Sequence, residues 1–413
     1  MVKTSDIMPH ETTTLDNTVL DTTTQDTTAL DTAALNTWLE ISEEAYGHNL
    51  RFFRQLVGPD VELSAVVKSN AYGHGMEPVA ELARRHGADS FCVHALDEAL
   101  RLRRAGYSED VLIMGHVPLA RLAEAIHADF RLVLYNPESA RRLMELTAEL
   151  DRPVRVHLKL ETGTHRQGLD DGDLKSLVES LTSEPRVQIE GAYTHFANIE
   201  DTTRHEYAEG QLRRYRRALD LLKELGVEPP KCHAACSAAT LLFPETHFHM
   251  VRLGVSQYGL WSSKETQLSY MMEHGGHVEG TLEPVLTWKT RISQVKDVPA
   301  GAFIGYGCTY QTTRPTRIAI LPIGYADGYD RHLSNQAHVL IRGRRAPVRG
   351  RICMNLTMVD VTDIPEAQLE DEVVLLGRQG NQHLAAADLA NLVGTIPYEI
   401  VARLNSDMPR LVV

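Results

Sequence analysis

Residues 64–75 read SAVVKSNAYGHG, a short apolar run followed by a lysine and a glycine-rich turn. The run Ala65–Val67 predicts a buried strand, and residues 70–73 carry the turn signal that ends it. Lys68 therefore lies at the end of a strand, although lysine is among the side chains least often buried. Partial burial lowers the pKa of an amine toward that of a nucleophile able to form a Schiff base. The alternative is a lysine that extends from the strand end into solvent, and the run alone leaves both interpretations open.

The length and composition indicate a large, acidic globular chain. It has 413 residues, 43% of them hydrophobic, which is enough for two domains. The formal net charge of −13 argues against nucleic acid and against an anionic membrane surface as partners. No run of 18 or more apolar residues is present, so no membrane span is predicted. The N-terminus has neither the basic start nor the apolar segment of a secretory signal, and the cytoplasm is the expected location.

The cysteines do not predict a metal site. Five are present, at positions 92, 232, 236, 308 and 353. Cys232 and Cys236 are four residues apart, but no second pair completes a set of zinc ligands. We therefore expect no metal, and free thiols in a reducing compartment.

The chain divides into three stretches that differ in residue composition and in the pattern of apolar runs. Residues 1–36 repeat a Leu-Asp-x-Thr/Ala unit rich in poor helix formers, and we interpret them as a low-complexity extension with little fixed structure. In residues 37–274, short apolar runs alternate with helical segments. The expected strands include 38–41, 64–68, 90–93, 111–114, 154–160 and 188–193. Such alternation predicts a parallel sheet with crossover helices, and the number of units favours a (β/α)8 barrel of the TIM type within the α/β class.

The pattern of apolar runs changes at about residue 275. The apolar runs 286–292, 317–321, 338–341 and 372–376 are separated by turns instead of helices. Residues 275–413 are therefore predicted to form a second, mostly antiparallel β domain.

Several polar residues follow predicted barrel strands. Arg166, His195, Ser237 and Arg252 each come at or just after the end of an apolar run. Because the carboxyl ends of the strands meet at one mouth of a barrel, these side chains are expected to converge with Lys68. Taken singly, His195 has a structural alternative as a buried hydrogen-bonding group, and Arg252 has one as an ion-pair partner.

The segment 64–75 resembles the lysine signature of the alanine racemase family, whose members use pyridoxal 5'-phosphate. Further matches are IGYGCTY at 304–310, IGYADGY at 323–329 and GRICMN at 350–355. The resemblance covers essentially all of residues 37–413. It implies the same architecture of a barrel followed by a β domain, and a homodimer in which each subunit completes the other's active site.

The resemblance also implies roles for individual residues. Lys68 holds the cofactor, His195 lies beside its ring and Arg252 faces its pyridine nitrogen. Arginine stays protonated in proteins and cannot pass a proton to that nitrogen, which disfavours side reactions such as transamination. The phosphate-binding residues implied are Tyr72, Ser237, Gly254, Val255 and Tyr398, whose hydroxyl and backbone N–H groups suit an anion.

Other matches concern the substrate. Arg166 and Met354 correspond to residues that bind the substrate carboxylate, and Lys159 to a lysine that some relatives carry as a carbamate. The implied entrance residues are Glu200, Tyr325, Arg331, Arg351 and Ile396, together with Tyr398. Three departures from the family pattern affect the surroundings of the site: THRQG at 164–168, Glu200 in place of aspartate and Asn355 in place of aspartate.

The function implied is racemisation of alanine, with D-alanine supplied to cell-wall peptidoglycan. Racemisation needs one base on each face of the Cα–H bond. Lys68 and Tyr306 of the partner subunit match these two bases, acting on the D- and the L-enantiomer respectively. A serine or broader-specificity racemase, a related amino-acid decarboxylase and a non-catalytic pyridoxal-phosphate carrier are the alternatives.

Overall fold

The computed structural model describes residues 32–147, 150, 152–276 and 280–413. Contacts group the chain into Met1–Leu35 and Asn36–Val413. Most of the low-complexity extension lies outside the described residues. In the described part of the extension, Thr32–Ala34 forms a single 3₁₀ turn. The account below concerns Asn36–Val413. The predicted domain boundary at residues 274 and 275 stays a prediction.

Eight parallel strands form the predicted barrel, in the order β8-β7-β6-β5-β4-β3-β2-β9. They are β2 (Glu62–Val66), β3 (Ser90–Val93), β4 (Asp110–Ile113), β5 (Arg131–Leu134), β6 (Val154–Lys159), β7 (Val187–Tyr193), β8 (Lys231–His233) and β9 (Met250–Leu253). The last of these strands in the chain, β9, pairs with the first, β2, as it does in a sheet that closes on itself. A backbone hydrogen bond from Arg252 N to Ala235 O, 3.1 Å long, links the segment after β8 to β9 and nearly closes the barrel.

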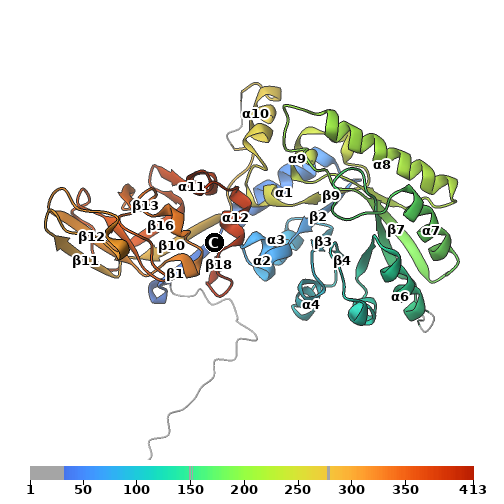
Figure 1. Cartoon of the computed structure of the whole chain (residues 1–413), viewed down its shortest axis with the longest axis horizontal. Coiled ribbons are helices and arrows are strands. Elements are labelled where there is room, and N and C mark those ends of the chain that lie inside the picture. Colours follow the sequence, from blue (N-terminus) through green and yellow to red (C-terminus); the bar gives the residue numbers. More distant parts are fainter. Residues whose placement is uncertain (1–31, 148–149, 151, 277–279) are drawn as a thin grey trace, which may run out of the picture. The chain divides into compact units, whose positions relative to one another are not determined.

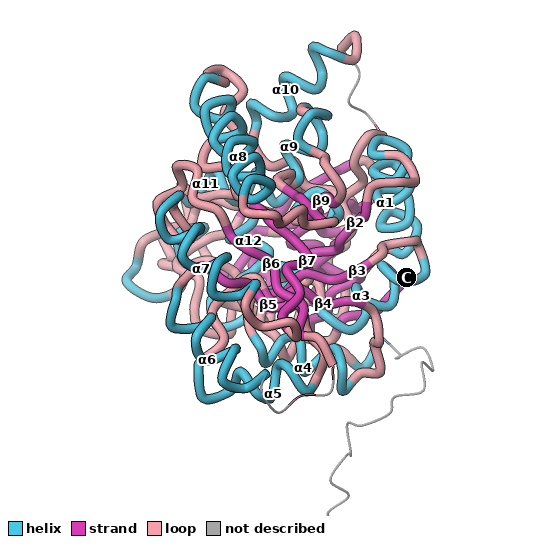
Figure 2. The backbone as a smooth tube through the Cα atoms, turned by 90° about the vertical axis from the view of Figure 1, so that its right-hand side faces the viewer, coloured by secondary structure: helices cyan, strands magenta, loops and turns pink. Residues whose placement is uncertain are grey.

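Helices surround these strands, as Figure 2 shows. They are α1 (Glu43–Val57), α2 (Lys68–Tyr72), α3 (Met76–Arg85), α4 (Leu96–Arg104), α5 (Leu122–His127), α6 (Pro137–Thr147), α7 (Asp171–Thr182), α8 (Glu206–Glu224), α9 (Ser237–Leu242) and α10 (Lys264–Glu273). Most positions of these strands are buried, so many of them are apolar and the short runs in the sequence do not alternate with polar residues. The prediction of a TIM-type barrel is confirmed.

The C-terminal part is a mostly antiparallel β domain, drawn in orange to red in Figure 1. Its larger sheet has the order β14-β13-β16-β10-β1-β18, with β17 paired to β16, and its smaller sheet is β11-β12-β15. The elements are β10 (Leu286–Arg291), β11 (Gln294–Val298), β12 (Thr316–Leu321), β13 (His338–Ile341), β14 (Arg344–Pro347), β15 (Thr357–Asp360), β16 (Glu372–Gln379), β17 (Gln382–Leu384), β18 (Arg410–Val412), α11 (Ala386–Val393) and α12 (Pro397–Ala402). This part of the fold also follows the prediction.

The expected strand at residues 38–41 forms, as β1 (Thr37–Ile41), but its predicted place among the parallel strands of the barrel is wrong, because it joins the C-terminal sheet. It pairs antiparallel with β10, Leu39 opposite Trp288, and parallel with β18, Leu39 opposite Arg410. The two ends of Asn36–Val413 therefore meet in one sheet. Among the described residues, no helix has the length and apolar content needed to cross a bilayer.

Candidate active site

Lys68 begins a turn of unusual handedness directly after β2. Ser69, Asn70 and Ala71 have φ of 53°, and Tyr72 has φ of 54°. The left-handed conformation costs an L-residue about 1–2 kcal/mol, so four in succession need support from the surrounding structure. Inside the turn, Ala71 N donates to Val67 O at 2.8 Å. Such strain concentrates at functional sites, and here it lies next to the half-buried Lys68.

The C-terminal segment holds this turn from outside. The Arg410 guanidinium, on β18, donates to Gly73 O through Nη2 at 2.9 Å and Nε at 3.2 Å. Asn70 Oδ1 accepts hydrogen bonds from Met76 N at 2.9 Å and from Arg101 Nη1 at 3.1 Å. The position of Lys68 therefore depends on the β domain as well as on the barrel.

We expect Gly73→Ala to destabilise the fold strongly. At Gly73, φ is +84°, and an added Cβ would lie 1.9 Å from the backbone oxygen of Val401 in α12. Strain and overpacking together should lower the free energy of unfolding by roughly 3–5 kcal/mol. Gly394→Ala is the matched control, because Gly394 is also left-handed, with φ of +73°, but has nothing within 4 Å of the added Cβ. Urea unfolding midpoints measure both, and equal losses would show that the contact with α12 is unimportant.

A cavity of about 500 Å³ opens at the carboxyl ends of the barrel strands. It brings together ten of the residues singled out from the sequence: Lys68, Tyr72, Arg166, His195, Glu200, Ser237, Arg252, Gly254, Val255 and Tyr398. Lys159 and Gln167, noted in the sequence for other reasons, line it as well. The cavity thus brings Arg166, His195, Ser237 and Arg252 together with Lys68, as expected from their strand-end positions, while the roles of the individual residues stay predictions.

One end of the cavity forms a cradle of hydroxyl and backbone N–H groups. Ser237 Oγ accepts hydrogen bonds from Gly254 N at 3.0 Å and Ser256 N at 3.2 Å. A Cβ on Gly254 would lie 2.9 Å from Tyr72 Oη, so only glycine leaves this space open. Burial raises the pKa of Tyr72 and of Tyr398, which keeps both phenols protonated as donors. The donor set fits a phosphate group.

The rest of the cavity is strongly cationic. Burial, followed by the charge of Arg166, lowers the pKa of Lys68. The same two causes lower the pKa of Lys159 to about 8. Burial and the charge of Arg252 lower the pKa of His195 to about 3, so this imidazole is neutral at pH 7. The cavity therefore combines an amine that loses its proton readily with positive charges that attract an anion.

Gln167 is part of a half-buried polar contact that the sequence did not predict. Lys159 Nζ donates to Gln167 Oε1 at 3.1 Å, and Gln167 Nε2 donates to the Tyr135 hydroxyl at 3.2 Å. Tyr193, which also lines the cavity, stacks on His233 with ring centroids 4.7 Å apart. Tyr135 directly follows β5, and Tyr193 is the last residue of β7. Their positions at strand ends are the sequence signal that would have revealed both tyrosines.

The remaining predicted residues lie on the C-terminal domain, outside the set of described residues that lines the cavity. They are Tyr306, Tyr325, Arg331, Arg351, Met354 and Ile396. Two of the motifs there, 323–329 and 350–355, are joined to each other: Tyr325 N donates to Cys353 O at 3.1 Å, and Ala326 N donates to Met354 O at 3.0 Å. Tyr306 and Met354 are strongly exposed, at 73% and 56%. One copy of the chain thus leaves these side chains in solvent.

Comparison with known proteins gives one consistent answer. The family described as Alanine racemase, N-terminal domain, matches residues 41–262, and Alanine racemase, C-terminal domain, matches residues 285–412. An alanine racemase of Leptospira interrogans is 40% identical over 380 residues, covering 92% of this chain and 96% of that protein. The alanine racemase of Symbiobacterium thermophilum is 41% identical over 381 residues, covering 91% of this chain and 96% of that protein.

Solved structures agree with the sequence comparison. The alanine racemase of Bacillus anthracis, determined with bound L-Ala-P, superposes with a TM-score of 0.85 at 36% identity, covering 92% of this chain and 95% of that one. The Streptomyces coelicolor enzyme gives a TM-score of 0.85 at 33% identity, covering 92% and 99%. Both domains and their order agree, and the chain belongs to the alanine racemase family.

Proposed function

We propose that the protein interconverts L- and D-alanine with pyridoxal phosphate as cofactor, in a homodimer. The observation that carries this proposal is the position of Lys68, an amine of lowered pKa that lines a cationic cavity with an anion cradle. A cytoplasmic location and the supply of D-alanine to cell-wall peptidoglycan are the further parts of the proposal that follow from family membership.

The donor set of the cavity suits pyridoxal phosphate. Lys68 is the amine that would hold its aldehyde carbon, and Tyr72, Ser237, Gly254, Val255 and Tyr398 would surround its phosphate. His195 and Arg252 would contact the ring. When bound, the cofactor supplies an electron sink for the charge that develops at Cα. Arg252 keeps its own protons and so cannot donate one to a ring nitrogen.

Two bases are needed because the two enantiomers present the Cα proton on opposite faces. Lys68 is one base, and Tyr306 is the other. Tyr306 is 73% exposed, and so a second copy of the chain has to bring this residue to the cavity. Phe303, Tyr325, Met354 and Leu356 are exposed on the same domain, between 42% and 56%, and apolar exposure of this kind is typical of an interface. We therefore propose an isologous dimer with two shared sites.

The substrate is proposed to bind among residues of both subunits. Arg166 lines the cavity next to the two lysines, and its guanidinium is a bidentate partner for the alanine carboxylate. Met354 would assist from the partner subunit. The proposed entrance residues are Glu200, Tyr325, Arg331, Arg351 and Ile396. Glu200 is the one barrel residue among them, and burial raises the pKa of its carboxyl group.

A panel of amino acids tests the proposal. The purified protein is incubated with pyridoxal phosphate and, separately, L-alanine, L-serine and a set of other L-amino acids, and the D-enantiomers are measured by chiral chromatography. We expect D-alanine to form fastest, and D-alanine as the starting material to give the L-enantiomer. Faster formation of D-serine or of a basic D-amino acid would reassign the substrate, and the absence of any D-product would contradict racemisation.

A further inference from the structure

A chain of buried polar side chains runs through the barrel below the cavity, where branched apolar residues are the rule. It starts at Arg252 on β9 and continues through His233 on β8 and His157 on β6 to Glu190 on β7. The exposed fractions of these residues are 4%, 0%, 2% and 8%. The mechanism proposed above uses Arg252 alone, and the other three residues have no part in it.

The donors and acceptors along this chain can point in one direction only. Arg252 Nη1 lies 2.5 Å from His233 Nδ1. A guanidinium has donors and no acceptor, so Nδ1 of His233 must accept, and the proton of this neutral ring is on Nε2. His233 Nε2 lies 2.9 Å from His157 Nδ1 and donates to it. The proton of His157 is therefore also on Nε2, which lies 3.2 Å from Glu190 Oε2.

The charge states agree with this direction. Burial, followed by the charge of Arg252, holds the pKa of His233 well below its usual value. Burial also lowers the pKa of His157. Burial opposes the ionisation of Glu190, but the hydrogen bond from His157 and the charge of Arg131 outweigh it and lower the pKa of this carboxyl to about 2. Two neutral imidazoles thus connect a cation to a carboxylate.

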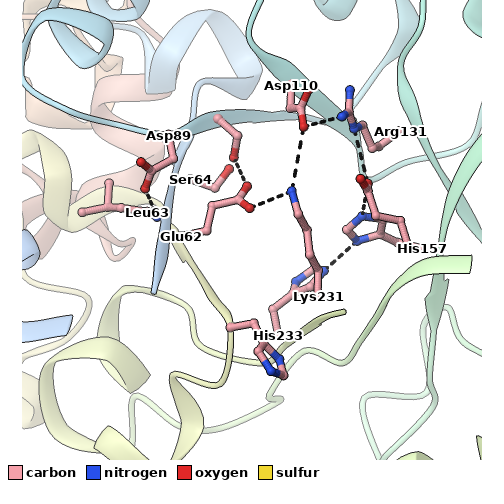
Figure 3. Close-up of polar contacts among 12 residues, drawn as sticks. Glu62, Leu63, Ser64, Asp89, Asp110, Arg131, His157, Lys231 and His233 are labelled. Atoms are coloured by element: carbon pink, nitrogen blue, oxygen red, sulfur yellow. Dashed lines mark hydrogen bonds and ion pairs between the residues drawn. The ribbon is translucent and has the colours of Figure 1, made fainter. Parts of the chain in front are cut away.

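Glu190 is itself fixed at the amino ends of the strands. Arg131 Nε lies 3.3 Å from Glu190 Oε2, and the same guanidinium pairs with Asp110. Lys231 Nζ completes the group, 2.8 Å from Glu62 Oε2 and 3.8 Å from Asp110 Oδ2. Figure 3 shows Glu62, Asp110, Arg131, His157 and Lys231 arranged around one another. The Arg131 guanidinium has donors and no acceptor, so Oε2 of Glu190 must accept from it. The same oxygen also accepts from His157 Nε2.

At the other end, the relay holds one of the two terminal nitrogens of Arg252. Nη2 donates to Thr194 O at 2.9 Å and Ala234 O at 3.1 Å, whereas Nη1 has His233 as its partner. We propose that Glu190, His157 and His233 form a one-way hydrogen-bond relay that fixes both imidazole tautomers and so orients the Arg252 guanidinium at the cavity. They are positioning residues. The effect of Arg252 on catalysis rests on the proposed function, but the tautomers do not.

The first experiment uses the native protein, with and without pyridoxal phosphate. ¹⁵N-histidine labelling and magic-angle-spinning NMR distinguish nitrogens that carry a proton from those that do not. The chain has 19 histidines, so the signals of His157 and His233 are assigned by their loss in His157→Gln and His233→Gln. We expect both rings to be neutral, with the proton on Nε2, in both preparations. A proton on Nδ1 of either ring, or a doubly protonated ring, would overturn the relay.

The second experiment compares Glu190→Gln with Glu190→Leu. Glutamine keeps a side-chain oxygen. Because Arg131 only donates, this oxygen takes the position that faces both Arg131 and His157, whereas leucine has no acceptor. We therefore expect Glu190→Leu to shift the His157 and His233 signals and to lower kcat about tenfold with KM for alanine nearly unchanged, since one hydrogen bond to a charged group is lost. Glu190→Gln should restore both readouts. Equal effects of glutamine and leucine would mean that the negative charge matters and the relay does not.

Glu62→Leu is the matched control, because Glu62 belongs to the same ionic group but contacts Ser90 and Lys231 instead of the relay. It should leave the two histidine signals and the ratio of kcat to KM unchanged. Identical behaviour of Glu62→Leu and Glu190→Leu would refute a positioning role. Absence of racemase activity in the native protein would refute the proposed function, while the histidine signals would still decide the relay. If Glu190→Leu does not fold, the native spectra and Glu190→Gln still decide it.

Discussion

Lys68→Ala is expected to abolish racemisation and the retention of pyridoxal phosphate. Lys68 is the cavity-lining amine at the end of β2, and burial lowers its pKa. It is proposed both to hold the cofactor and to act as one base. Removing a general base alone lowers the rate by up to about 10⁴-fold, and loss of the cofactor adds to this. Activity, together with the cofactor that stays with the protein in gel filtration, measures the two effects.

Lys68→Arg is the companion variant for this prediction. It keeps the positive charge at the strand end but has no amine that can form the covalent bond. We expect it to be as inactive as Lys68→Ala. Borohydride treatment of the native holoprotein should place a pyridoxyl group on the peptide that contains Lys68, as found by mass spectrometry. A pyridoxyl group found on another lysine, such as Lys159, would make that residue the lysine that holds the cofactor.

Tyr306→Phe should slow L-to-D conversion by about 10²–10⁴-fold, the usual contribution of a general acid or base. Pyridoxal phosphate binding should stay intact, because Tyr306 is 73% exposed and lies outside the residues that line the cavity. Initial rates from L-alanine and a cofactor titration measure the two properties. Unchanged racemisation would remove Tyr306 from the mechanism.

Mixing the two inactive variants tests whether the sites are shared. In a mixed dimer of Lys68→Ala and Tyr306→Phe, one site carries both defects and the other carries neither. With random exchange of an isologous dimer, half the dimers are mixed, and about a quarter of the native activity should return. Each variant refolded alone is the control. No recovery, with mixed dimers shown by native mass spectrometry, would mean that Lys68 of one subunit and Tyr306 of the other do not form a shared site.

The fold followed from local patterns. Buried parallel strands carry short runs of consecutive apolar residues, so runs such as 90–93 and 111–114 are visible without any knowledge of their neighbours. The convergence of Arg166, His195 and Arg252 was predictable for a related reason, since a barrel brings every strand end to one mouth. The partner of β1 was not predictable, because its pairing with β10 and β18 joins residues far apart in the chain.

The amino-acid sequence by itself therefore determined the barrel, the β domain and the convergence of several strand-end side chains with Lys68, because periodicity and strand-end position are local properties. Only the tertiary structure decided how these parts are held. The left-handed turn after Lys68 is unfavourable for Ser69, Asn70, Ala71 and Tyr72, and its support comes from Arg410, more than 300 residues away. The direction of the relay from Arg252 to Glu190 likewise depends on which side-chain atoms face one another, and only the packed strands of the nearly closed barrel establish those contacts.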